Sequence, residues 1–157
     1  MMTGQKAINL EKLRNAGIAV PAFSVIGHDE LCGGRLDLSA LPVLEDKSCE
    51  RFAVRSSASA EDSDTASFAG QFRTFLNVPR EEIESKARLC FASLHADNIR
   101  QYAGKNGLAP DDLRMDVIVQ RMVDAELAGV IFTSNPQGLL NESVITVGRG
   151  LGENVVS

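Results

Sequence analysis

The stretch Phe52-Ala-Val-Arg-Ser-Ser-Ala-Ser-Ala-Glu-Asp62, which leads through Gly70 to Thr74-Phe-Leu-Asn-Val78, decides how this chain folds. Short apolar runs bounded by Ser and Gly residues predict two β-strands, and Arg55 lies on the first of them. The loop between the strands is rich in small hydroxyl residues. A guanidinium binds phosphate oxygens bidentately, and small side chains let backbone N–H groups approach an anion. The segment therefore predicts a site for a nucleoside triphosphate or another polyanion.

Length and composition are those of a globular protein. The chain has 157 residues, enough for one domain or two small subdomains, and should bury about 70% of its unfolded surface. Its 21 acidic and 16 basic residues give a net charge of −5, which argues against binding to nucleic acid or to an anionic membrane. Neither a membrane-spanning run nor the apolar core of a signal peptide is present in the sequence. We therefore expect a cytoplasmic protein.

The cysteines predict neither a metal site nor a disulfide framework. Cys32, Cys49 and Cys90 are odd in number and lack CxxC spacing. We interpret all three as small buried hydrophobic residues.

Hydrophobic periodicity predicts three helices. The first covers residues 4–16 and ends at Gly17. Pro79, which two acidic residues follow closely, starts the second. The third covers residues 98–103. The side chains expected to face the core are Ala7, Leu10 and Leu13 in the first helix and Ile83, Ala87, Cys90, Phe91 and Leu94 in the second.

Segments rich in β-branched and aromatic residues predict six strands, whereas residues 27–50 fit no regular element because glycines and a proline interrupt them. The strand after the Gly70 loop is expected to place Phe72, Thr74, Leu76 and Val78 on one side. The mixture predicts an α/β fold with an α+β mixed sheet rather than an all-parallel one. The predicted strands are residues 21–26, 51–55, 71–78, 115–123, 129–133 and 143–147.

Five motifs in fixed order resemble one known family. The motifs are Arg55-Ser-Ser-Ala-x-Ala-Glu-Asp62, Ala66-Ser-Phe-Ala-Gly-Gln71, Val119-Gln-x-Met-Val123, Gly129-Val-x-Phe-Thr133 and Gly150-Leu-Gly-Glu-Asn-Val-Val156. Together they closely resemble the N-terminal ATP-binding domain, also called the PEP/pyruvate-binding domain, of phosphoenolpyruvate synthase and pyruvate phosphate dikinase. Rifampin phosphotransferases share that domain. The resemblance covers nearly the whole chain.

The resemblance implies a fold and an activity. It implies an ATP-grasp-like domain, of which residues 1–157 would be the first part of a two-part ATP clamp, truncated at its C-terminal end. In the intact enzyme this domain passes a phosphoryl group from ATP to a histidine on another domain. A third domain then delivers the phosphate to pyruvate, an antibiotic or a glucan, so phosphoenolpyruvate chemistry is not expected in this chain.

The family's motifs also imply the residues of the site. Lys6, in an opening that resembles the family's Gly-Gly-Lys motif, and Arg55 would contact phosphates and take part in catalysis. Gly70 would belong to the loop over the phosphates. Gln120, together with the backbone of its neighbours, would border the adenine. The full implied ATP-binding set is Lys6, Arg55, Gly70, Thr74, Gln120, Met122 and Val123.

Two departures from the family pattern bear on activity. Gln5 stands where the family has its second glycine, and the chain stops at Ser157, inside a motif. The family's Mg²⁺ ligands lie beyond that motif, so we expect ATP and Mg²⁺ as cofactors but no metal ligand in this chain. Because phosphoryl transfer depends on metal ions, the isolated chain is expected to be inactive.

Plainer interpretations stay open for the charged residues of the site. Lys6 fits a solvated helix position by composition alone. Arg55 can pair with Glu61 or Asp62, although a cation in an apolar strand needs a partner that offsets its desolvation, and a phosphate supplies one.

Polar residues near the site have alternatives as well. Gln120 lies in an apolar strand and needs hydrogen bonds, from adenine or from backbone. Glu153 fits a metal ligand or, as we prefer, a loop anchor. Ser56 and Ser57 are explained by turn formation. His28 and His95 lack the sequence context of the family's phosphohistidine and are interpreted as surface or partly packed residues.

Three functions follow from these observations. The preferred one is the ATP-binding portion of a phosphotransferase, whose partners are the phosphohistidine and PEP/pyruvate-type domains of the intact enzyme. The second is a non-catalytic nucleotide-binding or regulatory module, and the third is an interaction domain that binds no nucleotide. A clamp without its second half leaves sheet edges or apolar surface uncovered, so we also expect a homo-oligomer.

Overall fold

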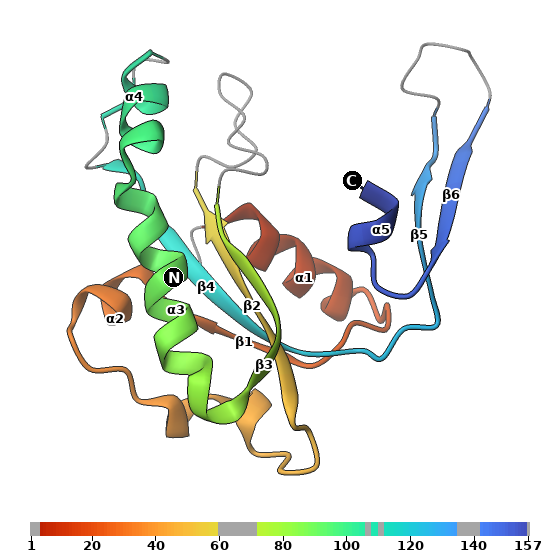
Figure 1. The fold of residues 1–157 in the computed structure, drawn as a ribbon, viewed down its shortest axis with the longest axis horizontal. Helices are drawn as coiled ribbons and strands as arrows, with labels where there is room; N and C mark the ends of the chain where they lie inside the picture. The colour runs from red at the N-terminus through yellow and green to blue at the C-terminus, as the bar shows by residue number, and fades with distance from the viewer. Residues whose placement is uncertain (1–3, 60–71, 106–107, 110–111, 135–141, 157) are drawn as a thin grey trace. The chain divides into compact units, whose positions relative to one another are not determined.

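The computed structural model describes residues 4–59, 72–105, 108–109, 112–134 and 142–156 (Figure 1). The chain divides into two compact units, residues 1–122 and residues 123–157.

The first unit is built on a four-stranded sheet. Its strands are β1 (Phe23–Ile26), β2 (Arg51–Ala58), β3 (Thr74–Pro79) and β4 (Met115–Arg121), in the order β1-β4-β2-β3. Every described strand pair is antiparallel, so the sheet is not all-parallel, as expected, but the prediction of a mixed sheet is wrong for the described strands. The predicted strand at 51–55 is three residues too short, because Ser56, Ser57 and Ala58 continue the ladder opposite Val117, Asp116 and Met115.

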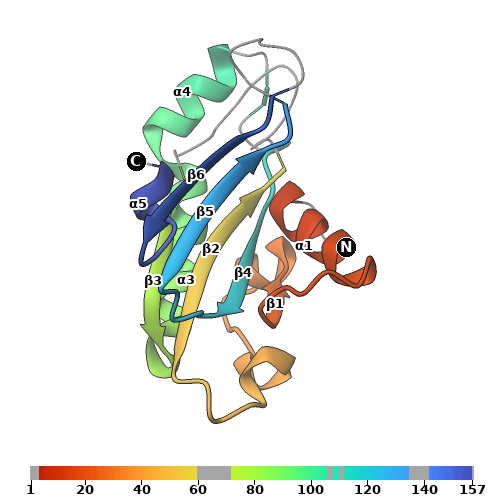
Figure 2. The same cartoon turned by 90° about the vertical axis from the view of Figure 1, so that its right-hand side faces the viewer.

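Helices cover both faces of this sheet (Figure 2). Helix α1 (Gln5–Asn15) lies on one face and α3 (Ile83–Ala92) on the other. Both confirm predicted helices, and α4 (Asp97–Lys105) confirms the third. The remaining short elements of this unit are α2 (His28–Cys32) and the 3₁₀ helices η1 (Leu38–Ala40), η2 (Pro42–Leu44), η3 (Arg80–Glu82) and η4 (Ser93–His95).

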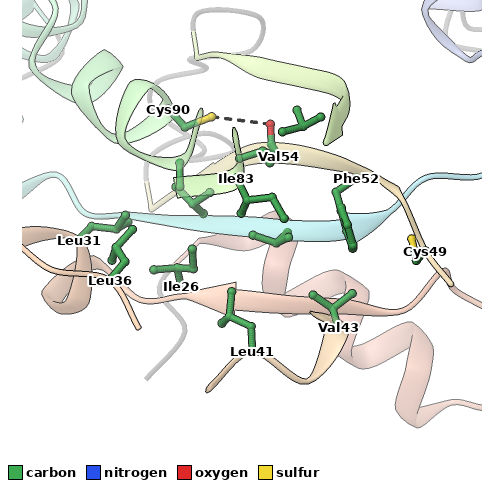
Figure 3. Close-up of a cluster of buried hydrophobic side chains, with 14 residues drawn as sticks. Ile26, Leu31, Leu36, Leu41, Val43, Cys49, Phe52, Val54, Ile83 and Cys90 are labelled. Atoms are coloured by element: carbon green, nitrogen blue, oxygen red, sulfur yellow. Dashed lines mark hydrogen bonds between the residues drawn. The ribbon is translucent and has the colours of Figure 1, made fainter. Parts of the chain in front are cut away.

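The main core lies between the sheet and α3 (Figure 3). Phe52 and Val54 of β2 and Val117 and Val119 of β4 are completely buried there, because alternate residues of a strand share one face. Residues 27–50 supply much of the rest of this core. These residues form short elements whose apolar side chains show no regular helix or strand spacing. The sequence pattern therefore predicted no element for them. The buried side chains are Leu31, Leu36, Leu41, Val43 and Cys49.

The predicted alternation on β3 is wrong. Thr74 lies opposite Arg55, whereas Val78 lies opposite Phe52 and is buried in the main core, so the two side chains occupy opposite faces. The register shifts between these pairs, and Asn77 adopts a φ of 55°. An extra residue of this kind, a β-bulge, reverses the faces of the side chains that follow it.

The prediction for the cysteines is confirmed for two of the three. Cys49 and Cys90 are buried, but Cys32 is exposed at the end of α2. The Cys90 sulfur lies 3.4 Å from the Arg73 carbonyl and 3.7 Å from the Val54 carbonyl, so its S–H can donate to either (Figure 3). Burial raises the pKa of the Cys90 thiol from 9.0 to about 12.

This raised pKa makes Cys90 a source of pH-dependent stability. The unfolded thiol loses its proton above pH 9.0, whereas the folded thiol keeps it up to about pH 12. Because the unfolded state then binds fewer protons, stability falls between these values, by at most about 1.4 kcal/mol per pH unit from this group. Urea unfolding at pH 7.5, 9 and 10.5 should show a steeper loss in the wild type than in Cys90→Ala. Parallel curves would show that the thiol does not titrate differently in the two states.

The second unit contains one hairpin and a short helix. Strands β5 (Leu127–Phe132) and β6 (Val144–Arg149) pair antiparallel, and α5 (Glu153–Val156) follows. One face of the hairpin is apolar and open, since its four large aliphatic side chains are 61–66% exposed. We call this face the hairpin patch, and its members are Leu127, Ile131, Ile145 and Val147.

Helices that could cross a membrane are absent from the described part of the chain.

Candidate functional site

Arg55 lies on the α1 face of the sheet. Strand alternation turns Phe52, Val54 and Ser56 toward α3, and it turns Arg55 and Ser57 the opposite way. Arg55 is half-buried between its two cross-strand neighbours, Thr74 on β3 and Ile118 on β4. A cation at the centre of a sheet must therefore find its partners on this one face.

Gln120 is the partner that the described structure gives to Arg55. The Arg55 Nη1 group donates to Gln120 Oε1 at 3.5 Å, and Gln120 Nε2 donates to the Pro21 carbonyl at 3.3 Å. Gln120 is only 7% exposed, so these bonds satisfy an amide that could not bond to bulk water. The sequence left adenine and backbone open as partners for Gln120, and the structure shows a backbone partner, the Pro21 carbonyl. The bond from Arg55 is a second partner that the sequence pattern did not predict.

The charge of Arg55 is not neutralised within the described part of the chain. None of the carboxylates described there forms an ion pair with Arg55. Glu61 and Asp62, the acids that the sequence offered as partners, lie outside the described residues. A guanidinium that meets a neutral amide keeps its full charge and most of its five donors for an anion.

Lys6 is placed on the same face by the start of α1. The backbone N–H of Gly4 donates to Asp116 Oδ2 at 3.1 Å, and that of Ala7 donates to Ser57 Oγ at 3.0 Å. Lys6 is half-buried between these two anchored residues. Because Ser57 follows Arg55 by two positions on β2, the first turn of α1 contacts the same face of the strand two residues beyond the arginine.

The glycine of the opening motif has a steric role at position 4. A Cβ atom at Gly4 would lie 2.0 Å from the Ser57 carbonyl oxygen and 2.1 Å from Ser57 Oγ. Gln5, which stands in place of the family's second glycine, is tolerated because its side chain lies on the helix surface and donates to Asn9 Oδ1 at 3.0 Å. This departure therefore leaves the start of α1 intact.

The other residues of the implied set are dispersed. Thr74 is exposed beside Arg55, and Met122 is half-buried at the end of the first unit, where its N–H donates to the Arg51 carbonyl at 3.0 Å. Val123 begins the second unit and is 53% exposed. Gly70 lies outside the described residues. The described structure thus brings together Lys6, Arg55, Thr74 and Gln120 on one face of the first unit.

Two residues of this face are not predicted by the sequence pattern. Ser57 was interpreted as a turn former, but it is completely buried in β2. Asp116 is also completely buried, and its Oδ1 accepts the His28 N–H at 3.2 Å while its Oδ2 binds Gly4. An aspartate inside the apolar run of β4 was the available signal, because a buried carboxylate requires several donors.

The histidines have structural partners. His28 Nδ1 accepts the Met115 N–H at 3.2 Å, which places the proton of the neutral ring on Nε2. His95 is exposed, and its ring meets Phe91 edge-on at 5.6 Å. Across the described residues, three or more His, Cys, Asp or Glu side chains never gather in a way that could hold a metal ion, and Glu153 is exposed at the start of α5.

The sequence matches one protein family. The model of the family described as "Pyruvate phosphate dikinase, AMP/ATP-binding domain" matches residues 39–157. That range contains Arg55, Gly70, Thr74 and Gln120 but begins after α1 and Lys6.

Named relatives agree with this match. A probable phosphoenolpyruvate synthase of Archaeoglobus fulgidus is 44% identical over 106 residues, which are 67% of this chain and 14% of the relative. A rifampicin phosphotransferase of a Streptomyces species is 45% identical over 108 residues, 68% of this chain and 12% of the relative. An uncharacterized phosphotransferase of Bacillus subtilis is 33% identical over 99% of this chain and 22% of its own length. The chain therefore spans between about an eighth and a fifth of the length of these relatives.

Proposed function

Because the chain belongs to the family of pyruvate phosphate dikinase AMP/ATP-binding domains, we propose that it binds ATP for a larger phosphotransferase. In the intact enzyme this portion supplies the phosphoryl group that a histidine on another domain accepts. The phosphohistidine domain and a PEP/pyruvate-type domain are then its partners. Two relatives named as phosphotransferases and one named as a probable phosphoenolpyruvate synthase support this assignment.

We propose an ATP-grasp-like architecture for the domain. Residues 1–157 then form the first part of a two-part clamp, whose second part the rest of the enzyme supplies. The family match over residues 39–157 and the small share of each relative that the chain covers support this division.

The observation that carries the proposed site is the half-buried Arg55 guanidinium, which meets a neutral amide 3.5 Å away. ATP brings several negative charges, and its phosphate oxygens match the planar fork of an arginine. Lys6 adds a second cation from α1. The sheet face between them is then the phosphate-binding surface.

Each remaining residue of the set has a role in this proposal. Thr74, exposed opposite Arg55, offers a hydroxyl to the phosphates, and Gly70 lets its loop approach them. Gln120 is held between Arg55 and the Pro21 carbonyl, and it borders the adenine together with the backbone of Met122 and Val123. Gln120 thereby links the base to the phosphate-binding cation.

Magnesium enters this proposal with the nucleotide. The described residues contain no group of three side chains that fits a metal ion, so they do not fit a complete magnesium site by themselves. When bound, Mg²⁺ neutralises charge that develops on the phosphates. The chain's own residues bind and orient the triphosphate, and the metal ligands lie in the rest of the enzyme. The isolated chain is then a binding module without transfer activity.

A calorimetric titration separates this function from its rivals. The 157-residue chain is titrated with Mg-ATP and, in a second experiment, with phosphoenolpyruvate. We expect heat of binding for Mg-ATP and none for phosphoenolpyruvate, since the proposal places that substrate on another domain. Binding of phosphoenolpyruvate alone would contradict the proposed site. A folded chain that binds neither ligand would favour an interaction domain.

We also propose that the isolated chain self-associates. The hairpin patch presents four neighbouring aliphatic side chains that are each more than 60% exposed. Contiguous apolar surface of this kind is normally covered by another surface. Light scattering at increasing protein concentration should give a rising average mass, and Ile131→Glu should lower it. A constant monomer mass at high concentration would contradict the expectation.

A further inference from the structure

We propose that Ser57 and Asp116 are positioning residues for Lys6, because they cap helix α1 from two neighbouring strands and so fix where Lys6 meets the nucleotide. The inference rests on the proposed function, in which Lys6 contacts the phosphates of ATP. It adds two residues that neither touch the ligand nor belong to the implied site.

Helix α1 lacks a cap of its own. The first N–H groups of a helix have no partner within the helix, and a Ser, Thr, Asp or Asn side chain at the N-cap usually accepts one of them. The N-cap of α1 is Gly4, which has no side chain. Ser57 Oγ accepts the N–H of Ala7, the third residue of the helix, at 3.0 Å. Ser57 thus supplies from β2 the bond that an N-cap serine would make.

The absence of a side chain at Gly4 is what allows Ser57 to lie against the start of α1. The Ser57 carbonyl and hydroxyl oxygens occupy the space that a Cβ at Gly4 would take, at 2.0 and 2.1 Å. The helix can approach the strand this closely only with glycine at its start. The cap is therefore supplied by a residue that is distant in sequence, and it fixes α1 to β2, the strand that carries Arg55.

Asp116 completes the cap and joins it to a second helix. Its Oδ2 accepts the Gly4 N–H at 3.1 Å, and its Oδ1 accepts at 3.2 Å the N–H of His28, the first residue of α2. His28 returns a bond to the same strand, since its Nδ1 accepts the Met115 N–H at 3.2 Å. Both oxygens of a fully buried carboxylate are thus occupied by donors from different segments. The carboxylate cannot rotate without breaking one of these bonds.

The hydrogen bonds of Gly4 and Ala7 to the sheet lie on either side of Lys6 in the sequence. Gly4 lies two residues before it and Ala7 one residue after it, and both N–H groups are bound to the sheet. Ser57 and Arg55 are two residues apart on one face of β2, which is about 6.6 Å along a strand. The Lys6 backbone is therefore fixed on the face of β2 that carries Arg55.

The charge of Asp116 also decides how α1 can recognise a phosphate. The N-terminus of a helix carries a partial positive charge that attracts anions. In α1 the Asp116 carboxylate already lies at that end. A phosphate is therefore recognised by the Lys6 side chain rather than by the end of the helix, so the position of this side chain matters.

A double-mutant cycle on ATP affinity tests the inference. The variants are Asp116→Asn, Lys6→Ala and the double variant, titrated with Mg-ATP below their unfolding transitions. Asparagine keeps one acceptor oxygen and turns an NH₂ group toward either the Gly4 or the His28 N–H. We expect Lys6→Ala and Asp116→Asn each to weaken binding about tenfold, as loss of one charged hydrogen bond does, and the double variant to be no weaker than Lys6→Ala.

Controls separate positioning from general destabilisation. Asp29→Asn removes an exposed carboxylate on α2 that pairs with Arg114. It should leave ATP affinity unchanged both in the wild type and in Lys6→Ala. Should Asp116→Asn fail to fold, Ser57→Ala removes only the hydroxyl cap and enters the same cycle. Urea unfolding of each variant gives its stability separately from its affinity.

The outcomes are distinct. Losses that add in the double variant would overturn the positioning role while leaving Lys6 as an ATP ligand. If Lys6→Ala leaves ATP affinity unchanged, this inference fails while ATP binding through Arg55 stands. If the wild-type chain binds no ATP, the proposed function fails and this inference fails with it. A double variant that matches Lys6→Ala supports both when Asp116→Asn alone weakens binding, whereas wild-type affinity of Asp116→Asn would overturn the positioning role.

Discussion

Gly4→Ala is expected to lower the free energy of unfolding by about 3 kcal/mol or more. A Cβ at this position overlaps β2 and forces helix α1 and the strand apart. The nearest atoms to that Cβ would be the Ser57 carbonyl oxygen at 2.0 Å and Ser57 Oγ at 2.1 Å. One of them is backbone, so no change of side-chain rotamer relieves the overlap. The shift also breaks the bonds from Gly4 to Asp116 and from Ala7 to Ser57.

Urea unfolding of the wild type and the variant measures this loss. Gly104→Ala is a matched control, because Gly104 lies in α4 with open space around it and no strained backbone angle. Alanine there should leave stability unchanged or raise it by up to about 1 kcal/mol through its higher helix propensity. Equal stability of Gly4→Ala and the wild type would show that α1 does not approach β2 as closely as the structure has it.

Arg55→Ala is expected to weaken Mg-ATP binding about 100-fold, the range for loss of bidentate hydrogen bonds between a guanidinium and a phosphate. The same change should cost stability little. In the described structure the side chain makes one long hydrogen bond, to Gln120 Oε1 at 3.5 Å, whose loss costs about 1 kcal/mol or less. A large effect on binding and a small one on folding is the pattern of a ligand-binding residue.

Two further variants make the Arg55 result specific. Arg55→Lys keeps the charge but not the planar fork, so its affinity should lie between those of the wild type and Arg55→Ala. Arg88→Ala removes a guanidinium from α3 on the opposite face, where it pairs with Glu84, and should leave affinity unchanged. A melting temperature that falls sharply in Arg55→Ala while ATP affinity holds would identify a structural arginine.

Local patterns in the sequence predicted the regular elements well. The buried Ala7 of α1 and the buried Ile83, Ala87 and Cys90 of α3 follow from helical spacing alone, whereas Leu13, expected on the same face as Ala7, is 40% exposed. Residues 27–50 were beyond such patterns, since their apolar side chains are buried by contacts that are distant in sequence. The bulge at Asn77 was also not predictable from alternation, because it depends on pairing with β2.

The site was predictable only in part, for a similar reason. Arg55 stands out as a cation in an apolar strand, and Gln120 as a buried amide that needs partners. That these two would bond to each other depends on the pairing of β2 with β4. The roles of Ser57 and Asp116 need the position of α1 as well, since each bonds to a segment more than 40 residues away, at separations of 50 and 112 residues.

The central claim is that the phosphates of ATP bind on the Arg55 face of the sheet, and NMR of the chain titrated with Mg-ATP tests it most directly. The signals to follow are the Arg55 Nε–Hε group, the Gln120 side-chain amide and the backbone amides of Lys6 and Thr74. We expect these four to shift most, while the Arg88 Nε–Hε signal on the other face stays in place. Shifts that saturate elsewhere and leave the Arg55 and Gln120 signals unmoved would contradict the account.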